Sequence, residues 1–362
     1  MTEALIRDLD FTGVDINPLA ALVCEAKVAI DAGADIEGAA QTVLSALRSD
    51  IYDAIDVEFP GINKWFDDES AVNFSRLRRA ISQVEDKGAR RVMWTVFAET
   101  VRLCSNSRTS TYKLHIRASG DHVDANQVLL TFDTNLRQSL MRVREYRELI
   151  GTRKTKRPLV RIICGDARKA PLKWNISDHQ ILVTSPPYGD NQTTIPYGQF
   201  SYLAMRWIPE DDFPSSDAKR LMANTNALDA VSLGGTVRGA EEKETAVRAT
   251  SQHFDAFVRE AERTDRKLAI RKVSSFIGDF ADVLNHMRSS WAGTAHWVLT
   301  TGNRTAAGLT VPFDAICKDL VTKLGGKPIT SLHRQLPNKR MPLRNSQGAM
   351  ITTETTTVFE FS

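Results

Sequence analysis

Short apolar runs and helically spaced apolar positions alternate along this chain. A short strand is predicted from Phe11 to the acidic Asp15, and the apolar runs at 159–164 and 181–183 predict two more, whereas apolar residues between 51 and 151 recur at near-helical spacings. The helical spacing includes Val72, Leu77, Ile81 and Val84, and then Val92, Val96 and Val101. The pattern therefore predicts an α/β protein with a helical insertion.

The remainder of the chain follows the same alternation after a polar stretch at 209–271. Within that stretch we expect a flexible turn at Gly234-Gly235 and a helix over 242–267. Further on, the pattern predicts helices at 276–287 and 313–324, and strands at 296–300, 329–332 and 355–361. Aromatic residues between 191 and 207 are expected to line a pocket or, more simply, to pack in the core.

Two consecutive prolines make the loop after 181–183 chemically distinctive. Each lacks a backbone N–H and pushes the preceding residue out of the helical region, so Ser185 and Pro186 should be extended. At the carboxyl end of a buried strand, the loop would present the Ser185 hydroxyl and the Pro186 carbonyl as acceptors. Such acceptors suit an exocyclic base amine, and Tyr188 offers a ring for base stacking. A plain strand-ending turn is the alternative.

An acidic residue ends the first predicted strand. Asp15 is followed by Asn17, which can cap a helix, and by Pro18, which suits a first helical position. A carboxylate at the end of a strand in a doubly wound sheet can accept hydrogen bonds from ribose hydroxyls. The alternative is a second helix cap or a surface turn.

Three segments resemble the S-adenosylmethionine (SAM) dependent DNA amino-methyltransferases. Thr184-Ser185-Pro186-Pro187-Tyr188 resembles their motif IV, in which Ser-Pro-Pro-Tyr is mostly associated with N4-cytosine methylation and Asp-Pro-Pro-Tyr with N6-adenine methylation. The run 13–20 with 25–27 resembles the segment after the SAM-binding glycine loop in one branch. The strand 159–164, together with Gly165-Asp166 directly after it, resembles motif III.

The resemblance implies roles for individual residues. It places Asp166 against the adenine amine of SAM. The implied catalytic residues are Ser185, Pro186, Pro187 and Tyr188, and the implied cofactor-binding residues are Asp15, Ile16, Asn17, Gly165, Asp166, Ala167 and Thr184. No metal is expected.

The glycine loop of that family is missing from this sequence. Only fourteen residues precede Asp15, fewer than a βα unit with its loop requires, and no later glycine pair has the needed spacing. A split enzyme, a degenerate remnant and a truncated gene would each explain this. We favour a split enzyme, a heterodimer with an N-terminal methyltransferase subunit that carries the glycine loop, because the other site residues are kept and a partner would cover the open sheet edge.

The resemblance also organises the chain. The expected fold is a class I SAM-methyltransferase (Rossmann-like) doubly wound sheet that is incomplete at its N-terminus. Its core comprises 1–50 with the second βα unit, 158–208 with motifs III and IV, and 272–362. A mainly helical insertion occupies 51–157, and a polar and helical insertion, either a lid or a target-recognition element, occupies 209–271.

Composition fits an intracellular enzyme. The 362 residues suffice for a sizeable core, and neither a signal-like start nor a bilayer-spanning apolar run is present, so we expect a cytoplasmic protein. The four cysteines are too widely spaced for a zinc site and are expected to be reduced core thiols. A net charge of +3 does not by itself indicate a nucleic-acid partner.

Local basic clusters are candidates for DNA phosphate contacts. They lie in a small-polar stretch at 103–113, in the basic run 142–157 and in the loop after 333. Solvated linkers, helices and loops are the alternatives. The candidate residues are Arg108, Lys154, Lys156, Arg157, Arg334 and Arg340.

The sequence therefore predicts an enzyme that methylates an exocyclic amine of a flipped DNA base, cytosine N4 before adenine N6, in a restriction-modification setting. Ser185 favours cytosine. Guanine N2 methylation of tRNA is a second enzymatic possibility, because Pro-Pro-Tyr-Gly also resembles some tRNA methyltransferases. A non-catalytic DNA-binding or regulatory subunit is the third.

Overall fold

The structure is a computed structural model of a mixed α/β chain that divides into two compact units. It describes residues 1–111, 113–151, 157–172, 179–188, 196–291, 293–336 and 353–362. Unit 1 contains Met1–Asp166 and Tyr197–Leu228, and unit 2 contains Ala167–Pro196 and Asp229–Ser362. None of the helices in the described ranges is both long and apolar enough to cross a bilayer.

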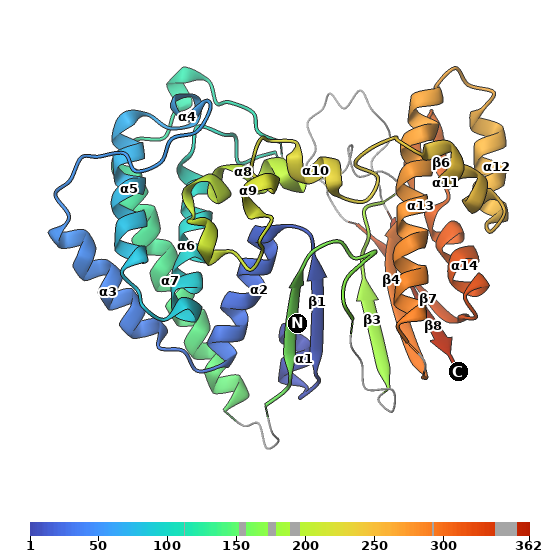
Figure 1. The fold of residues 1–362 in the computed structure, drawn as a ribbon, viewed down its shortest axis with the longest axis horizontal. Helices are drawn as coiled ribbons and strands as arrows, with labels where there is room; N and C mark the ends of the chain where they lie inside the picture. Colours follow the sequence, from blue (N-terminus) through green and yellow to red (C-terminus); the bar gives the residue numbers. More distant parts are fainter. Residues whose placement is uncertain (112, 152–156, 173–178, 189–195, 292, 337–352) are drawn as a thin grey trace. The chain divides into compact units, whose positions relative to one another are not determined.

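Unit 1 is built on a pair of parallel strands. β1 (Phe11–Asp15) pairs with β2 (Val160–Cys164), so that Asp15 lies opposite Cys164 at the carboxyl ends. The helix α2 (Pro18–Asp31) follows β1 and packs on both strands (Figure 1). Both predicted strands, and the helix start after Asn17, are confirmed.

Helices form the rest of unit 1. The long helix α6 (Lys87–Cys104) contacts α2, α3 (Ile36–Ser49), α5 (Asp68–Ser82), α7 (Asn126–Ile150) and α8 (Tyr197–Trp207). Its Trp94 and Phe97 lie in an aromatic core with Phe74 of α5. Acidic N-caps begin several helices, since Asp35, Asp67 and Asp86 each accept a backbone N–H. The remaining helices are α1 (Thr2–Ile6), α4 (Ile62–Trp65) and α9 (Ala218–Leu221), with α10 (Ala227–Val231) crossing the boundary between the units and 3-10 turns at Ser119–Asp121 and Glu210–Asp212.

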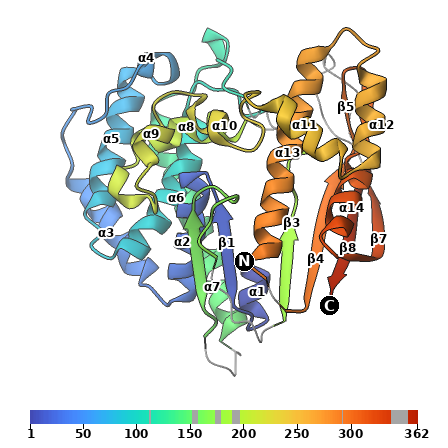
Figure 2. The ribbon, with the colours of Figure 1, turned by 45° about the vertical axis from the view of Figure 1, so that its right-hand side comes forward.

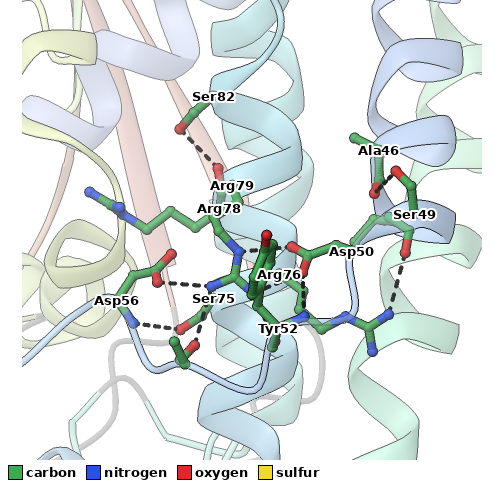
Figure 3. A network of polar contacts seen from close by, with 12 residues as sticks. Ala46, Ser49, Asp50, Tyr52, Asp56, Ser75, Arg76, Arg78, Arg79 and Ser82 are labelled. Atoms are coloured by element: carbon green, nitrogen blue, oxygen red, sulfur yellow. Dashed lines mark hydrogen bonds and ion pairs between the residues drawn. The ribbon is translucent and has the colours of Figure 1, made fainter.

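One arginine holds the irregular segment between α3 and α4. Arg79 of α5 pairs with Asp50 at 2.8 Å and with Asp56 at 2.8 Å, and it also donates to the carbonyls of Tyr52 and Ala54 (Figure 3). A segment without regular structure leaves its carbonyls without ladder partners, and the guanidinium supplies several donors in one plane. Arg79 therefore supplies hydrogen-bond donors to carbonyls that a helix or a sheet would otherwise pair.

Unit 2 contains a four-stranded mixed sheet. The strand order is β3 (Gln180–Thr184), β4 (Ala295–Gly302), β8 (Thr353–Phe361) and β7 (Lys327–Gln335) (Figure 2). β3 and β4 are parallel, whereas β8 runs antiparallel to both of its neighbours. A short hairpin, β5 (Arg304–Ala306) with β6 (Leu309–Val311), follows β4. The helices are α11 (Ala240–Arg248), α12 (Gln252–Ala261), α13 (Lys267–Ser289) and α14 (Phe313–Lys323). Their core contains Phe276, Phe280, Phe313, Trp297 and Phe359.

The helix predicted over 242–267 is wrong. The chain leaves the helical conformation at Ser251, whose hydroxyl accepts the N–H of Phe254 and thereby begins α12. The same hydroxyl donates to Asp319 of α14 at 2.7 Å, which fixes the break. Two short helices and the start of α13 therefore occupy the region.

The predicted flexible turn at Gly234 is instead buried and held. Gly234 has a φ of +69°, and its N–H donates to the buried carboxylate of Asp279 at 2.8 Å. A Cβ at this position would lie 2.7 Å from the Cβ of Phe276. The turn requires glycine for both its backbone conformation and its close packing.

Candidate functional site

Asp15 ends β1 with a carboxylate suited to accept hydrogen bonds. Its Oδ1 accepts the N–H of Asn17 at 2.8 Å, and its carbonyl accepts the N–H of Gly165 at 2.9 Å. Although the residue as a whole is exposed, surrounding atoms desolvate the carboxyl and raise its pKa, while the bond from Asn17 opposes that rise. Neither oxygen of this carboxylate forms an ion pair with a described residue, which suits a hydroxyl ligand such as ribose.

Asn17 fixes the turn that leaves Asp15. Its Oδ1 accepts the N–H of Leu19 as the α2 cap, and its Nδ2 donates to the Ser201 hydroxyl of α8 at 2.6 Å. Ser201 in turn donates to the Tyr197 carbonyl. One donated and one accepted hydrogen bond therefore hold the side chain of Asn17 inside unit 1.

The strand end carrying Asp166 lies beside Asp15 in the same unit. Asp15 and Cys164 are register partners, and Gly165 follows directly, with open space where a Cβ would stand. Burial is the main cause that raises the pKa of the Cys164 thiol to about 11. Cys164 is thus a neutral thiol that forms no disulfide at this edge. The structure brings Asp15, Gly165 and Asp166 to one end of the β1–β2 pair.

Ala167 and Thr184 belong to unit 2. Arg168, which follows Ala167, forms an ion pair with Asp279 at 2.6 Å. The same carboxylate forms a second ion pair with Lys243 at 2.8 Å. A buried carboxylate is stable only when it is paired, and here two cations and the Gly234 N–H surround it. This network anchors the start of unit 2 to α11 and α13.

The loop that follows β3, which the resemblance identifies as motif IV, has its predicted acceptor residue exposed. Ser185 is exposed, Pro186 is buried and Tyr188 is partly buried. The expectation of a buried strand before this loop is wrong: the side chains of Ile181 and Val183 are 55% and 72% exposed. β3 has a single partner strand, β4, among the described residues.

The Tyr188 hydroxyl contacts both the sheet and Ser185 of its own loop. It donates to Glu354 Oε1 of β8 at 2.9 Å and lies 3.4 Å from the Ser185 hydroxyl. Glu354 Oε2 accepts from Arg334 of β7 at 2.5 Å. Burial raises the pKa of Tyr188, the Ser185 bond lowers it, and Glu354 raises it further.

The candidate phosphate contacts differ in their surroundings. Arg108 is exposed and lines a pocket of about 240 Å³ in unit 1, together with Ser107, Lys113 and Phe200. Arg157 pairs with Asp31 at 3.0 Å, and Arg334 pairs with Glu354. Lys154, Lys156 and Arg340 lie outside the described residues.

Other side chains near the candidate segments have structural roles. Tyr202 and Trp207 are buried, as core packing predicts, whereas Tyr197 and Phe200 are 49% and 43% exposed. Within the described ranges, His, Cys, Asp and Glu side chains do not form a group of three suited to a metal ion.

Two partners of the candidate residues were not predicted from the sequence. Ser201 binds Asn17 across 184 positions, and Glu354 binds Tyr188 across 166 positions. Neither residue lies in a recognisable motif, because each acts through a contact that only the folded topology creates. The nearest available signal is the predicted strand 355–361, which begins one residue after Glu354.

One comparison relates the whole chain to a known protein. The chain is 26% identical to the Type II methyltransferase M.MvaI of Kocuria varians over 368 residues, covering 96% of this chain and 77% of that protein. No protein-family model matches the chain, and no solved structure matches it. The similarity extends across both units, so the chain as a whole, and not one short motif, is similar to a Type II methyltransferase.

Proposed function

We propose that this protein is a DNA methyltransferase that transfers the methyl group of SAM to an exocyclic amine of a flipped base. The observation that supports this most is the Ser-Pro-Pro-Tyr loop after β3, in which Ser185 is exposed, in a chain similar to a Type II methyltransferase over 96% of its length. Cytosine N4 is the first choice because position 185 is a serine.

Unit 1 supplies residues suited to SAM. The Asp15 carboxylate would accept from the ribose hydroxyls and Asp166 from the adenine amine, with Ile16, Asn17 and Gly165 beside them at the same strand ends. The Asp15 backbone is fixed by Gly165, so the carboxylate is positioned before the ligand arrives. Bound SAM supplies an electrophilic methyl on its sulfonium.

Unit 2 supplies residues suited to the base. The Ser185 hydroxyl and the Pro186 carbonyl would accept the two amine hydrogens, which favours a pyramidal nitrogen with a lone pair free to attack. Pro187 keeps the loop stiff, and Tyr188 would stack on the base, an interaction worth about 1–3 kcal/mol. Orientation of this kind lowers the barrier by up to about 7–11 kcal/mol without a covalent intermediate.

The strand arrangement supports a class I methyltransferase fold that a partner completes. Among the described strands, β1 pairs only with β2 and β3 only with β4. Parallel strands are usually covered on both faces, yet Ile181 and Val183 of β3 are exposed. A partner that carries the glycine loop would offer a strand for such an edge and a helix for these side chains.

Labelled methyl transfer from SAM to DNA, followed by nucleoside identification, tests the proposal. The chain is assayed alone and after co-expression with the product of its upstream gene. We expect N4-methylcytosine only in the co-expressed sample. N6-methyladenine would change the base, and methylated tRNA would change the substrate. SAM binding without transfer would indicate a DNA-binding or regulatory subunit.

A matched pair of variants ties the activity to the loop. Ser185→Ala should lower transfer at least about tenfold, the usual effect of losing an oriented hydrogen bond at a reacting group. Thr322→Ala, which removes an exposed hydroxyl on α14 in the same unit, should leave transfer unchanged. Equal activities of the two variants would remove Ser185 from the site.

A further inference from the structure

Three side chains from separate parts of unit 2 form a chain of polar contacts that ends at Ser185. Arg334 contacts Glu354, Glu354 accepts from Tyr188, and the Tyr188 hydroxyl lies 3.4 Å from Ser185 Oγ. Arg334 and Glu354 are direct register partners on β7 and β8. The side chain of Glu354 is 15% exposed, whereas that of Arg334 is 74% exposed.

We propose that Glu354 is a positioning residue for the methyl-transfer site, holding the Tyr188 ring in place and orienting the Ser185 hydroxyl as an acceptor. This inference rests on the proposed function. It assigns a role to a residue that no motif of the chain contains.

The first part of the role concerns the ring. Rotation about the first side-chain torsion of a tyrosine swings the whole ring and carries the hydroxyl away, so a contact at the hydroxyl holds the side chain in one rotamer. The Glu354 contact fixes the hydroxyl end to β8, which pairs with β4 on one side and β7 on the other. The Tyr188 ring is therefore attached to the middle of a sheet, although its backbone lies in a loop.

The second part concerns the direction of hydrogen bonds. An ionised carboxylate only accepts, and the Tyr188 hydroxyl carries one hydrogen, which the 2.9 Å contact assigns to Glu354. The Ser185 hydroxyl must then donate its own hydrogen toward Tyr188, which leaves its lone pairs for another donor. An incoming base amine is such a donor. Arg334 favours this polarity by stabilising the charged form of Glu354.

The variants Tyr188→Phe and Glu354→Ala, and the double variant, test the coupling. Tyr188→Phe keeps the ring and removes the hydroxyl, so both single variants should lower kcat about tenfold with little change in KM for SAM. The double variant should be no slower than either single one, because both remove the same contact. Glu354→Gln retains an acceptor oxygen and should recover part of kcat.

Glu360→Ala is the matched control, because Glu360 is exposed on the same strand and should leave kcat unchanged. Losses of kcat that multiply in the double variant would overturn the inference while leaving the proposed function standing. An inactive wild-type protein in the presence of its partner would instead overturn the proposed function and, with it, the role assigned to Glu354.

A measurement without activity tests the contact itself. In protein with ¹³C-labelled tyrosine, the Tyr188 signal is assigned from its absence in Tyr188→Phe and titrated by NMR. Glu354 raises the pKa of Tyr188, so Glu354→Ala should lower it relative to wild type, and Glu360→Ala should not. An unchanged pKa in Glu354→Ala would show that the contact does not exist in solution, whatever the enzyme's activity.

Discussion

The amide of Asn17 donates to the hydroxyl of Ser201 at 2.6 Å, joining the start of α2 to α8. The two residues are 184 positions apart, and both are buried. The same Asn17 side chain caps α2. One side chain therefore fixes both the helix and the turn that presents Asp15.

Replacing Asn17 should cost more than replacing its partner. Asn17→Ala loses the cap and the buried bond, so the free energy of unfolding should fall by about 2 kcal/mol. Ser201→Ala keeps the cap and should cost roughly half as much. Urea denaturation followed by circular dichroism measures both. Equal losses would show that the cap contributes nothing.

SAM affinity should depend on the ionisation of Asp15. Desolvation raises the pKa of this carboxyl, so it takes up a proton at a higher pH than an exposed aspartate does. Since only the ionised form accepts from both ribose hydroxyls, affinity should fall as the pH is lowered through that raised pKa. Calorimetric titration with SAM at several pH values, on the form of the protein that binds it, measures this.

Variants distinguish the effect of Asp15 ionisation on SAM affinity from the effect of removing any negative charge. Asp15→Ala should weaken SAM binding roughly tenfold to a hundredfold, and Asp15→Asn should remove the pH dependence. Asp53→Asn, which removes an exposed charge from the same unit, should change neither. A wild-type pH profile retained in Asp15→Asn would assign the titration to another group.

Local chemistry predicted the segment around Asp15 well. Asn17 and Pro18 begin a helix because capping and the fixed φ of proline act within a few residues, and the structure confirms this start. The break at Ser251 was missed, although Ser251 precedes α12 as a normal N-cap, because apolar spacing continued across it. The roles of Glu354 and Ser201 could not be predicted from the sequence, since their contacts depend on strand order and helix packing.

The exposure of β3 was missed for a related reason. Three apolar residues in sequence indicate a buried strand, but burial depends on what covers the strand. Ile181 and Val183 lie on the same face of β3, and both residues are exposed there. The proposed partner remains a prediction that the co-expression experiment tests.

Arg79 should stabilise unit 1 in a pH-dependent way. Its hydrogen bond is the main cause that lowers the pKa of Asp50 below the ordinary value. A lowered folded-state pKa gives stability that is present above the unfolded pKa of about 3.9 and is lost as the pH falls through the folded one. The Arg79→Ala loss, roughly 1–2 kcal/mol at neutral pH, should therefore shrink below about pH 4.

Thermal unfolding from pH 7 to pH 3 measures this dependence. The control is Arg137→Ala, which removes an exposed pair with Asp133 on α7 and should cost much less than Arg79→Ala at neutral pH, with little dependence on pH. If the Arg79→Ala loss stayed constant down to pH 3, the ion pair with Asp50 would not be its source.

Gly234 and Gly325 provide a matched comparison of backbone strain and steric overlap. Both have positive φ, +69° and +92°, but only Gly234 would place a Cβ within 4 Å of other atoms, at Phe276. Gly325→Ala should therefore cost about 1–2 kcal/mol from the backbone alone, and Gly234→Ala about 3 kcal/mol or more. Chemical denaturation of the two variants measures the difference, and similar values would mean that Phe276 moves aside without cost.

The position of β8 has a consequence for how the protein is made. β8 lies between β4 and β7, so β7 has no neighbour in the sheet until residues 353–361 are in place. During translation, β3, β4 and β7 are all synthesised before this strand emerges from the ribosome. The sheet of unit 2 therefore stays incomplete until β8 is synthesised. In a nascent chain halted before residue 353, the unpaired edges of β4 and β7 would be open to chaperones or to aggregation.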